Sequence, residues 1–210
     1  MLCANKRTGD ELVNVREELQ RELGIIPAIQ LNDVEVDPAA IRAIMINEVV
    51  PADPAQDFYG SSGEEYLSTA IPLFQRAGLQ VQGIADILAM GVYITNAVKT
   101  PKTAYAIENA SMEESLPWLE KELSLFPNVQ VIMLMGDVAK KMYNRIARKT
   151  NRKNVIPSGA TYKLRNEAFY HGNIRVIPSY IITGGNILIE KSKAAMVAED
   201  IAAMAKIIGK

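Results

Sequence analysis

Residues 42–60 read RAIMINEVVPADPAQDFYG, and this stretch decides what kind of fold the chain adopts. It begins with the apolar run Ala43-Ile44-Met45-Ile46, whose residue types suit a buried strand. The run stops at Asn47-Glu48, and an irregular loop with two prolines and two aspartates follows. Open α/β sheets bind their ligands where buried parallel strands end in this way. The stretch therefore predicts a strand followed by one wall of a binding pocket.

Strand-like and helix-like segments alternate from residue 42 to the end of the chain. Further strands are expected within 91–98, 129–135 and 174–179, which are apolar almost throughout. Helices are expected over 10–23, 63–77, 83–90, 111–125, 137–149 and 187–208, with Pro72 splitting or kinking the second. Residues 150–173 read as a hairpin or loop excursion with a β-like segment at 161–164. This alternation predicts a parallel sheet with helices on both sides.

The bulk composition is that of an ordinary globular protein and excludes several classes of function. A chain of 210 residues predicts one domain, 1–210, in which residues 1–40 form an N-terminal helical extension. The single cysteine, Cys3, excludes a disulfide framework and a cysteine-rich metal or cluster site, so no cofactor is expected. No signal peptide pattern is present, and no apolar run reaches the roughly 18 residues of a membrane span, so we expect a cytoplasmic protein without membrane contact.

Polar side chains end three of the predicted strands: Asn47-Glu48, Thr95-Asn96 and Pro178-Ser179-Tyr180. In a parallel sheet these ends share one edge. A buried asparagine suits a base edge that carries C=O beside N–H, although Asn96 can equally serve the backbone of neighbouring loops. The ring of Phe58 can lie against a flat ligand or simply fill the core. The only histidine, His171, sits in a predicted surface turn, so no Ser-His-Asp arrangement is expected.

Positive charge is concentrated in one segment of this nearly neutral chain. Between Val138 and Asn166 there are nine basic residues and no Asp or Glu. Such a segment is typical of a phosphate-facing surface, and its other interpretation is an ordinary solvated face. The nine candidates for nucleic-acid binding are Lys140, Lys141, Arg145, Arg148, Lys149, Arg152, Lys153, Lys163 and Arg165.

Five short motifs, in the right order and spacing over about residues 42 to 205, resemble those of the uracil-DNA glycosylase superfamily. The nearest branch is the compact one whose usual members carry an iron–sulfur cluster. The first motif is similar to GEAPG or GQDPYH, the second to Phe-x-Gly, and the third to a strand ending in Asn before a hydrophobic-Lys pair. The fourth is similar to a strand followed by Gly and a helix-starting Asp or Glu and then Ala, and the last to Pro-Ser/Thr-Tyr-His-Pro-Ser. The matching segments are Asn47-Glu48-Val49-Val50-Pro51, Phe58-Tyr59-Gly60, Thr95-Asn96-Ala97-Val98-Lys99, Met135-Gly136-Asp137-Val138-Ala139 and Ile177-Pro178-Ser179-Tyr180-Ile181-Ile182-Thr183.

The resemblance implies a three-layer αβα sandwich with a central four-stranded parallel sheet. It also implies that a uracil or other damaged base, flipped out of DNA, stacks on Phe58 and is read by Asn96. The chain differs from the family's motifs in four respects. Val49 occupies the position of the family's water-activating Asp, Ile181 that of its catalytic His, Asn47 that of a glycine, and the cluster cysteines are missing.

Cleavage of an N-glycosidic bond needs a donor for the departing base and a group that orients water. Candidates to orient water are Glu48, Asp53 and Asp57, in the loop region after the first strand. The remaining substrate-binding candidates, beside Asn47, Phe58 and Asn96, are Ser179, Tyr180 and Thr183. The first hypothesis is a DNA-repair glycosylase of weak or altered activity. The second is an inactive nucleic-acid-binding protein that keeps the pocket, and the third is a pocket for a nucleobase or acidic metabolite.

Overall fold

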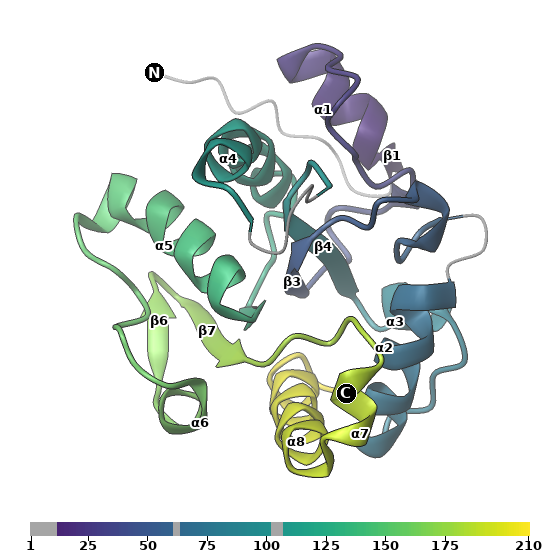
Figure 1. Ribbon diagram of the computed structural model, residues 1–210, viewed down its shortest axis with the longest axis vertical. Coiled ribbons are helices and arrows are strands. Elements are labelled where there is room, and N and C mark those ends of the chain that lie inside the picture. Colours follow the sequence, from purple (N-terminus) through teal and green to yellow (C-terminus); the bar gives the residue numbers. More distant parts are fainter. Residues whose placement is uncertain (1–11, 61–63, 102–106) are drawn as a thin grey trace.

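A five-stranded sheet forms the middle layer of the computed structural model, which describes residues 12–60, 64–101 and 107–210 (Figure 1). The strand order is β4-β3-β5-β7-β6. Four of these strands are mutually parallel: β3 (Ala43–Val49), β4 (Val92–Val98), β5 (Val131–Met135) and β7 (Ile174–Ser179). The predicted parallel sheet is confirmed, and the short strand β6 (Phe169–His171) adds an antiparallel edge.

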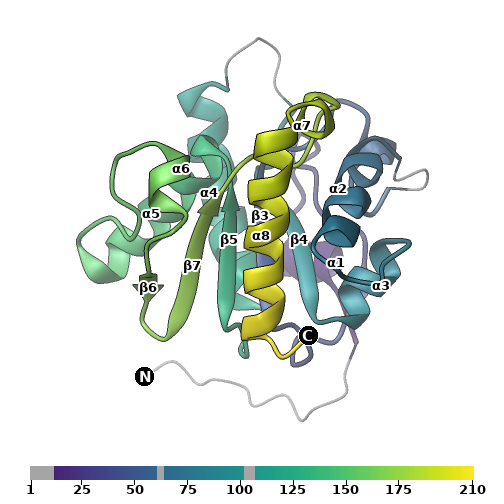
Figure 2. The same cartoon turned by 90° about the horizontal axis from the view of Figure 1, so that it is seen from below.

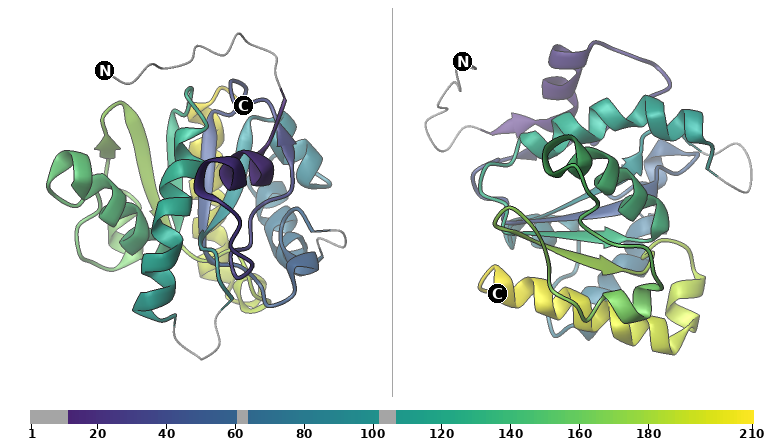
Figure 3. Two further views of the ribbon diagram at one scale, coloured as in Figure 1. Left: turned by 90° about the horizontal axis from the view of Figure 1, so that it is seen from above. Right: turned by 90° about the vertical axis from the view of Figure 1, so that its left-hand side faces the viewer.

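Helices cover both faces of the sheet, as expected for a three-layer αβα sandwich (Figures 2 and 3). One face carries α1 (Val15–Leu23), α4 (Asn109–Ser124) and α5 (Asp137–Asn151), and the other carries α2 (Glu64–Arg76) and α8 (Lys191–Ile207). The short helices are η1 (Pro54–Gln56), α3 (Ile84–Ala89), α6 (Thr161–Leu164) and α7 (Asn186–Ile189). Strands β1 (Val13–Asn14) and β2 (Glu35–Val36) form a separate antiparallel pair. No helix in the described ranges is long and apolar enough to cross a membrane.

The two faces of the sheet build two separate cores, which explains the nearly continuous apolar runs. Ile44 and Ile46 of β3 belong to the cluster under α1, α4 and α5. Ala43 and Met45 belong to the cluster under α2 and α8. Because strand side chains alternate between faces and both faces are covered, every position in such a strand is apolar until the strand reaches the edge where the polar residues begin.

Several local predictions are wrong, for reasons visible in the hydrogen bonds. Helix α1 begins at Val15 because the Asn14 side chain accepts a hydrogen bond from the Glu17 amide; the predicted cap, Asp10, lies outside the described residues. Residues 161–164 form a helical turn and not a β-like segment, and the hairpin is instead β6 with β7. Pro72 does not split α2, which is one continuous helix, whereas the predicted final helix is divided into α7 and α8.

Candidate active site

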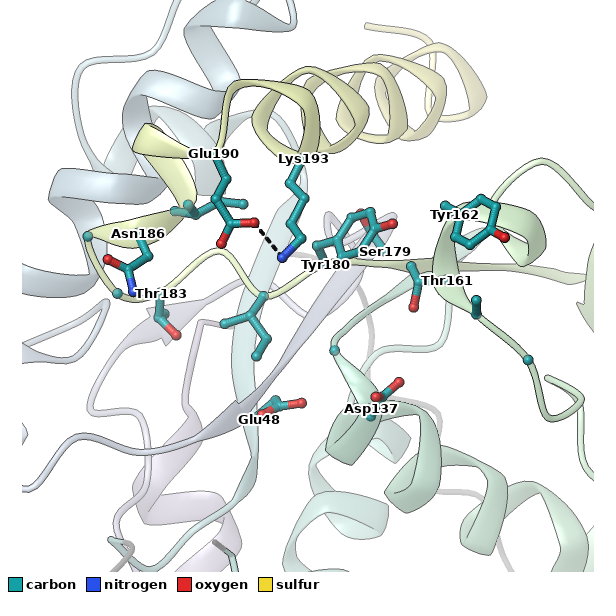
Figure 4. A pocket seen from close by; sticks show the side chains of 17 residues that line it. Glu48, Asp137, Thr161, Tyr162, Ser179, Tyr180, Thr183, Asn186, Glu190 and Lys193 are labelled. Carbon is teal, nitrogen blue, oxygen red and sulfur yellow. Dashed lines mark ion pairs between the residues drawn. The ribbon is translucent and has the colours of Figure 1, made fainter. Parts of the chain in front are cut away.

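A cavity of about 590 Å³ opens at the carboxyl ends of β3 and β7 (Figure 4). Glu48 contributes from β3, and Gly136 and Asp137 contribute from the start of α5. The segment from Ser179 to Ile187, between β7 and α7, forms the opposite wall. The structure therefore brings Glu48 together with three predicted site residues from a distant part of the sequence, Ser179, Tyr180 and Thr183.

The carboxylate of Glu48 is held at the amino-terminal end of α5. Its Oε1 accepts a hydrogen bond from the Val138 amide at 3.0 Å. A helix amino terminus favours negative charge, because its first amide groups have no partner within the helix. Gly136 makes this approach feasible, since a Cβ at that position would collide with the Glu48 carboxylate and with Ile181. Glu48 is thus a fixed carboxylate on the cavity wall, where it can orient a water molecule.

The opposite wall supplies hydrogen-bond donors and one cation. Lys193 pairs with Glu190 at 2.5 Å, and its Nζ lies 5.9 Å from the centre of the Tyr180 ring. Figure 4 shows Lys193 and Tyr180 on one side of the cavity and Glu48 across from them. Ile181, which stands where the resemblance implies a histidine, is 38% exposed and lines the same wall. Its side chain offers neither a donor nor a base.

Ser179 is fully buried, and its hydroxyl is occupied by a contact within the protein. Its Oγ donates to Oδ2 of Asp200 at 2.6 Å, and Arg165 Nε donates to Oδ1 of the same carboxylate at 3.0 Å. Arg165 also pairs with Glu199 at 2.8 Å. Burial raises the pKa of Asp200, and the hydrogen bonds from Arg165 and Ser179 oppose that rise. Arg165, predicted to contact phosphate, has its guanidinium bound to two carboxylates of α8 in this structure.

Two fully buried asparagines face the same side of the sheet. Asn47 and Asn96 are partners in the register of β3 with β4, and their side chains are 0% and 1% exposed. Asn96 Nδ2 donates to both carboxylate oxygens of Asp57 at 3.0 Å. Within the described ranges, Asn96 Oδ1 and both polar atoms of Asn47 find no hydrogen-bond partner. Burying an amide without partners is costly, so this pair is a candidate for contact with a ligand.

The loop after β3 separates the other predicted residues from the cavity. Asp53 caps η1 by accepting a hydrogen bond from the Ala55 amide at 3.0 Å, and it is exposed and does not line the cavity. Asp57 is buried, which raises its pKa, and it also accepts a hydrogen bond from the Phe58 amide at 2.8 Å. Phe58 is fully buried against Tyr66, with ring centroids 5.2 Å apart. In this structure the Phe58 ring is a core residue, which was the alternative interpretation of that motif.

Most of the predicted basic residues lie on the surface of α5 and the segment that follows it. Six are exposed: Lys141, Arg148, Lys149, Arg152, Lys153 and Lys163. Lys140 differs, since it is buried and bound to Asp137 at 2.6 Å and to Thr161 at 3.0 Å. A second cleft of about 260 Å³, lined by Lys141 and Arg148 among others, shares Asp137 and Gly159 with the main cavity. A basic surface thus continues from the cavity along α5.

The sequence alone did not reveal several residues of this site. Asn186 of α7, Glu190 between the two helices and Lys193 of α8 line the cavity. The sequence predicts a tight loop at Asn186 and one continuous helix over 187–208, and it does not single out these three residues. The Gly184-Gly185 pair immediately before Asn186 was the available signal, because it marks a break in regular structure near a strand end. His171 was expected on the surface, but Tyr143 and Thr150 contact its two ring nitrogens, so its role is structural.

Comparison with known proteins supports one family. The family model described as the uracil DNA glycosylase superfamily matches residues 50–185, which is more than half of the chain. A search of curated proteins finds no match. In the part of the chain that the structure describes, no group of three or more His, Cys, Asp or Glu residues is arranged to hold a metal ion.

Proposed function

The chain belongs to the uracil DNA glycosylase superfamily, and from this premise we propose that it hydrolyses the N-glycosidic bond of a damaged base flipped out of DNA. One observation carries the proposal. The buried amides of Asn47 and Asn96 lie side by side at the end of the sheet, with polar atoms that lack partners among the described residues. The next residue of β3, Glu48, lines the cavity. A candidate base reader and a candidate water-orienting carboxylate are therefore consecutive residues of one strand, and because strand side chains alternate they leave opposite faces of it at its carboxyl end.

The chemistry requires two kinds of help, and the cavity contains residues suited to each. The sugar becomes cation-like as the bond breaks, and a water oriented by Glu48 can capture it. The departing base becomes an anion, which the hydroxyls of Tyr180 and Thr183 and the ammonium of Lys193 can stabilise. Ser179 is excluded from this role because its proton is donated to Asp200.

The base must displace residues that cover the two amides, because neither amide has exposed area. The segment after β7 contributes residues both to the cavity wall and to the buried core. Ile181 and Thr183 line the cavity, whereas Ile182 between them is fully buried in the same core cluster as Phe58. The Ile182 carbonyl accepts a hydrogen bond from Thr69 at 2.6 Å, which ties this segment to α2.

The basic surface along α5 supports DNA as the partner. Its exposed lysines and arginines can contact phosphates without reading sequence, and this surface adjoins the cavity. A flipped nucleotide in the cavity would therefore leave its flanking phosphates near α5.

A second candidate function is binding without hydrolysis, and two side chains favour it. Val49 has no carboxylate, and its carbonyl accepts the Tyr66 hydroxyl at 2.9 Å. Ile181 places an apolar side chain on the cavity wall where the resemblance implies a donor. If Glu48 and the opposite wall cannot replace those groups, the protein retains the pocket and loses catalysis.

The decisive experiment is a base-release assay with single- and double-stranded oligonucleotides that contain uracil, hypoxanthine or xanthine. We expect the purified protein to release at least one of these bases. We expect Glu48→Gln to lower the rate by about 100-fold or more, which is the usual contribution of a general base. Glutamine keeps an oxygen that can accept the Val138 amide, so the fold is retained. Glu113→Gln, an exposed change on α4, is the matched control and leaves the rate unchanged.

Absence of release from all six substrates would overturn the proposed hydrolysis. Fluorescence anisotropy with the same oligonucleotides at low salt then separates the two candidates. Salt-dependent binding would support the non-catalytic function, and no binding at any salt concentration would remove both.

A further inference from the structure

Tyr162 is an exposed aromatic residue in the wall of the main cavity. It belongs to α6 and is 54% exposed. Lys163 Nζ lies 5.6 Å from the centre of its ring, so positive charge lies beside the aromatic surface. Figure 4 shows the ring at one end of the cavity, beyond Thr161 and away from Thr183 and Asn186. A flat ring with this exposure is available to stack on a base.

The residues next to Tyr162 hold α6 in place. Leu164 is 6% exposed and belongs to the core cluster under α1, α4 and α5. Thr161 Oγ1 accepts a hydrogen bond from Lys140 Nζ at 3.0 Å. Arg165, which follows α6, is bound to two carboxylates of α8. The ring is therefore presented from a fixed backbone, which reduces the conformational entropy that a stacked ligand would cost.

The cavity is larger than a single base requires. Its volume of about 590 Å³ lies in the range of pockets that hold a whole drug-sized ligand, roughly 300–1,000 Å³, and a pyrimidine ring is only a fragment of that size. Glu48 and Tyr162 both line the cavity, from β3 and α6. In the view of Figure 4, Asp137 and Thr161 lie between these two side chains. The cavity therefore has room for a second base beside the flipped one.

The main cavity continues into the smaller basic cleft along α5. The two share Asp137 and Gly159. Asp137 is exposed there, but Lys140 pairs with it at 2.6 Å, so a cation offsets its charge. Lys141 and Arg148 line the cleft beyond this point. A nucleic-acid backbone that runs from the cavity into the cleft would place phosphates among cations, the arrangement that sites for single strands combine with aromatic stacking.

We infer that the cavity takes two consecutive nucleotides of single-stranded DNA, with the flipped base beside Glu48 and the neighbouring base stacked on Tyr162. The inference rests on the proposed function, because it takes the Glu48 end of the cavity as the place of the damaged base. Tyr162 lines the cavity itself, so the neighbouring base can reach the ring only after leaving the stack of a duplex. A duplex must be unpaired a second time for this, whereas a single strand has no pair to break.

The first test is a cycle between the protein and the DNA. Fluorescence anisotropy measures the affinity for single-stranded oligonucleotides whose deoxyuridine carries a fluorinated sugar that resists cleavage, with an abasic spacer on either side of it or on neither. For the wild-type protein, we expect the spacer on one of the two sides to weaken binding by about fivefold or more, the contribution of one base stacked on an aromatic side chain.

Tyr162→Ala should show the same loss with the intact oligonucleotide and no further loss with that spacer, because the two changes remove one contact. Tyr162→Phe keeps the ring and should keep the wild-type affinity. Losses from Tyr162→Ala and from the spacer that simply add would overturn the stacking role.

Tyr170→Ala is the matched control. Tyr170 is 58% exposed and has a cation beside its ring, since the guanidinium carbon of Arg175 lies 5.5 Å from the ring centre. It lines neither the main cavity nor the basic cleft. This variant should keep the wild-type affinity for every oligonucleotide. Equal losses from Tyr162→Ala and Tyr170→Ala would contradict a specific site at Tyr162.

The second test compares the single strand with the duplex of the same sequence. We expect the wild-type protein to bind the single strand more tightly by about tenfold or more, because the duplex must also unpair and unstack the neighbouring base. Tyr162→Ala should reduce that difference. Equal affinity for the two forms, or a larger effect of Tyr162→Ala on the duplex, would contradict the inferred single-stranded substrate.

The inference and the proposed hydrolysis fail in different ways, because these measurements use DNA that is not cleaved. Coupled losses at Tyr162, without base release from any cleavable oligonucleotide, would contradict hydrolysis alone. Base release by a wild-type protein whose binding ignores the neighbouring bases would contradict the two-nucleotide site alone. No binding of either form at low salt would contradict both. The spacer series is measured on the wild-type protein, so it decides the matter even if Tyr162→Ala does not fold.

Discussion

Arg165 and Asp200 form a buried ion pair, with side chains 8% and 5% exposed, that joins the end of α6 to α8. Such a pair adds little net stability when complete, because both charges are removed from water. Removing one partner is different, since the other charge then remains buried alone. Ser179, which lines the cavity, donates to the same carboxylate, so the pair also supports the carboxyl end of β7.

We predict that Arg165→Leu lowers the free energy of unfolding by about 3 kcal/mol near neutral pH. The loss depends on pH in a defined direction. Burial already raises the pKa of Asp200 above its ordinary value of 3.8, and losing Arg165 raises it further. Such a group stabilises the fold below the unfolded-state pKa, and this contribution disappears as the pH rises through the folded-state pKa. Denaturant unfolding should therefore show the variant closest to wild type at low pH.

Lys163→Leu is the matched control, because Lys163 is exposed two residues away. It should change stability little at any pH. Equal destabilisation by Arg165→Leu at low and neutral pH would show that lost packing, and not the unpaired carboxylate, dominates.

Arg165 also shows which parts of a site the sequence cannot reveal. In the sequence it is one of nine bases without an intervening acid, and its partners lie more than 30 residues further along the chain. Asp57 is a similar case, since its contact with Asn96 joins residues 39 positions apart. Local patterns identified both residues as functional candidates. Which contacts each residue makes depends on how the loop and the helix fold against the sheet.

At the scale of elements, the start of α5 sets the position of the Glu48 carboxylate. Gly136 precedes the helix with φ of +107°, a conformation that is essentially restricted to glycine. Because Gly136 has no Cβ, Glu48 and Ile181 can both approach it closely. The strand end, the helix start and the segment after β7 thus converge at one residue.

We predict that Gly136→Ala lowers stability by roughly 1–3 kcal/mol through backbone strain alone, and that it also displaces Glu48 and reduces base release. Gly172→Ala is the control, because Gly172 has φ of +59° but no neighbouring atom within 4 Å of an added Cβ. The control should lose about 1–2 kcal/mol from the left-handed backbone and keep its catalytic rate. Similar rates for both variants would separate Gly136 from catalysis.

The strands that are covered by helices on both faces could be predicted from the sequence, and the short elements near the edge of the sheet could not. The central parts of β3, β4, β5 and β7 can be predicted as strands without knowledge of the fold, because a strand covered on both faces is apolar throughout. Thr161 and Tyr162 have β-forming side chains, yet four residues cannot outweigh tertiary context, and they form a helical turn. Strand β6 is only three residues long and exists because it pairs with β7.

At the scale of the whole molecule, a net charge of −1 conceals a separation of charge. The exposed bases follow α5 and the next segment, beside the main cavity and the smaller basic cleft. Some are already engaged at the surface, since Lys149 pairs with Glu120 and Lys141 donates to Asn109. Arg148 and Arg152 are exposed near the end of α5 and are the most direct candidates for phosphate contact.

We predict that DNA binding weakens steeply with salt, and that each phosphate contact contributes about 0.7–0.9 to the slope of log affinity against log salt concentration. Changing both Arg148 and Arg152 to glutamine should reduce the magnitude of that slope by roughly 1.4–1.8. Affinity should fall equally for oligonucleotides with and without a damaged base, because phosphate contacts carry no base information. Lys206→Gln, an exposed change near the end of α8, is the control for net charge. An unchanged slope in the double variant would place the DNA elsewhere on the molecule, and an equal loss in the control would reduce the effect to overall charge.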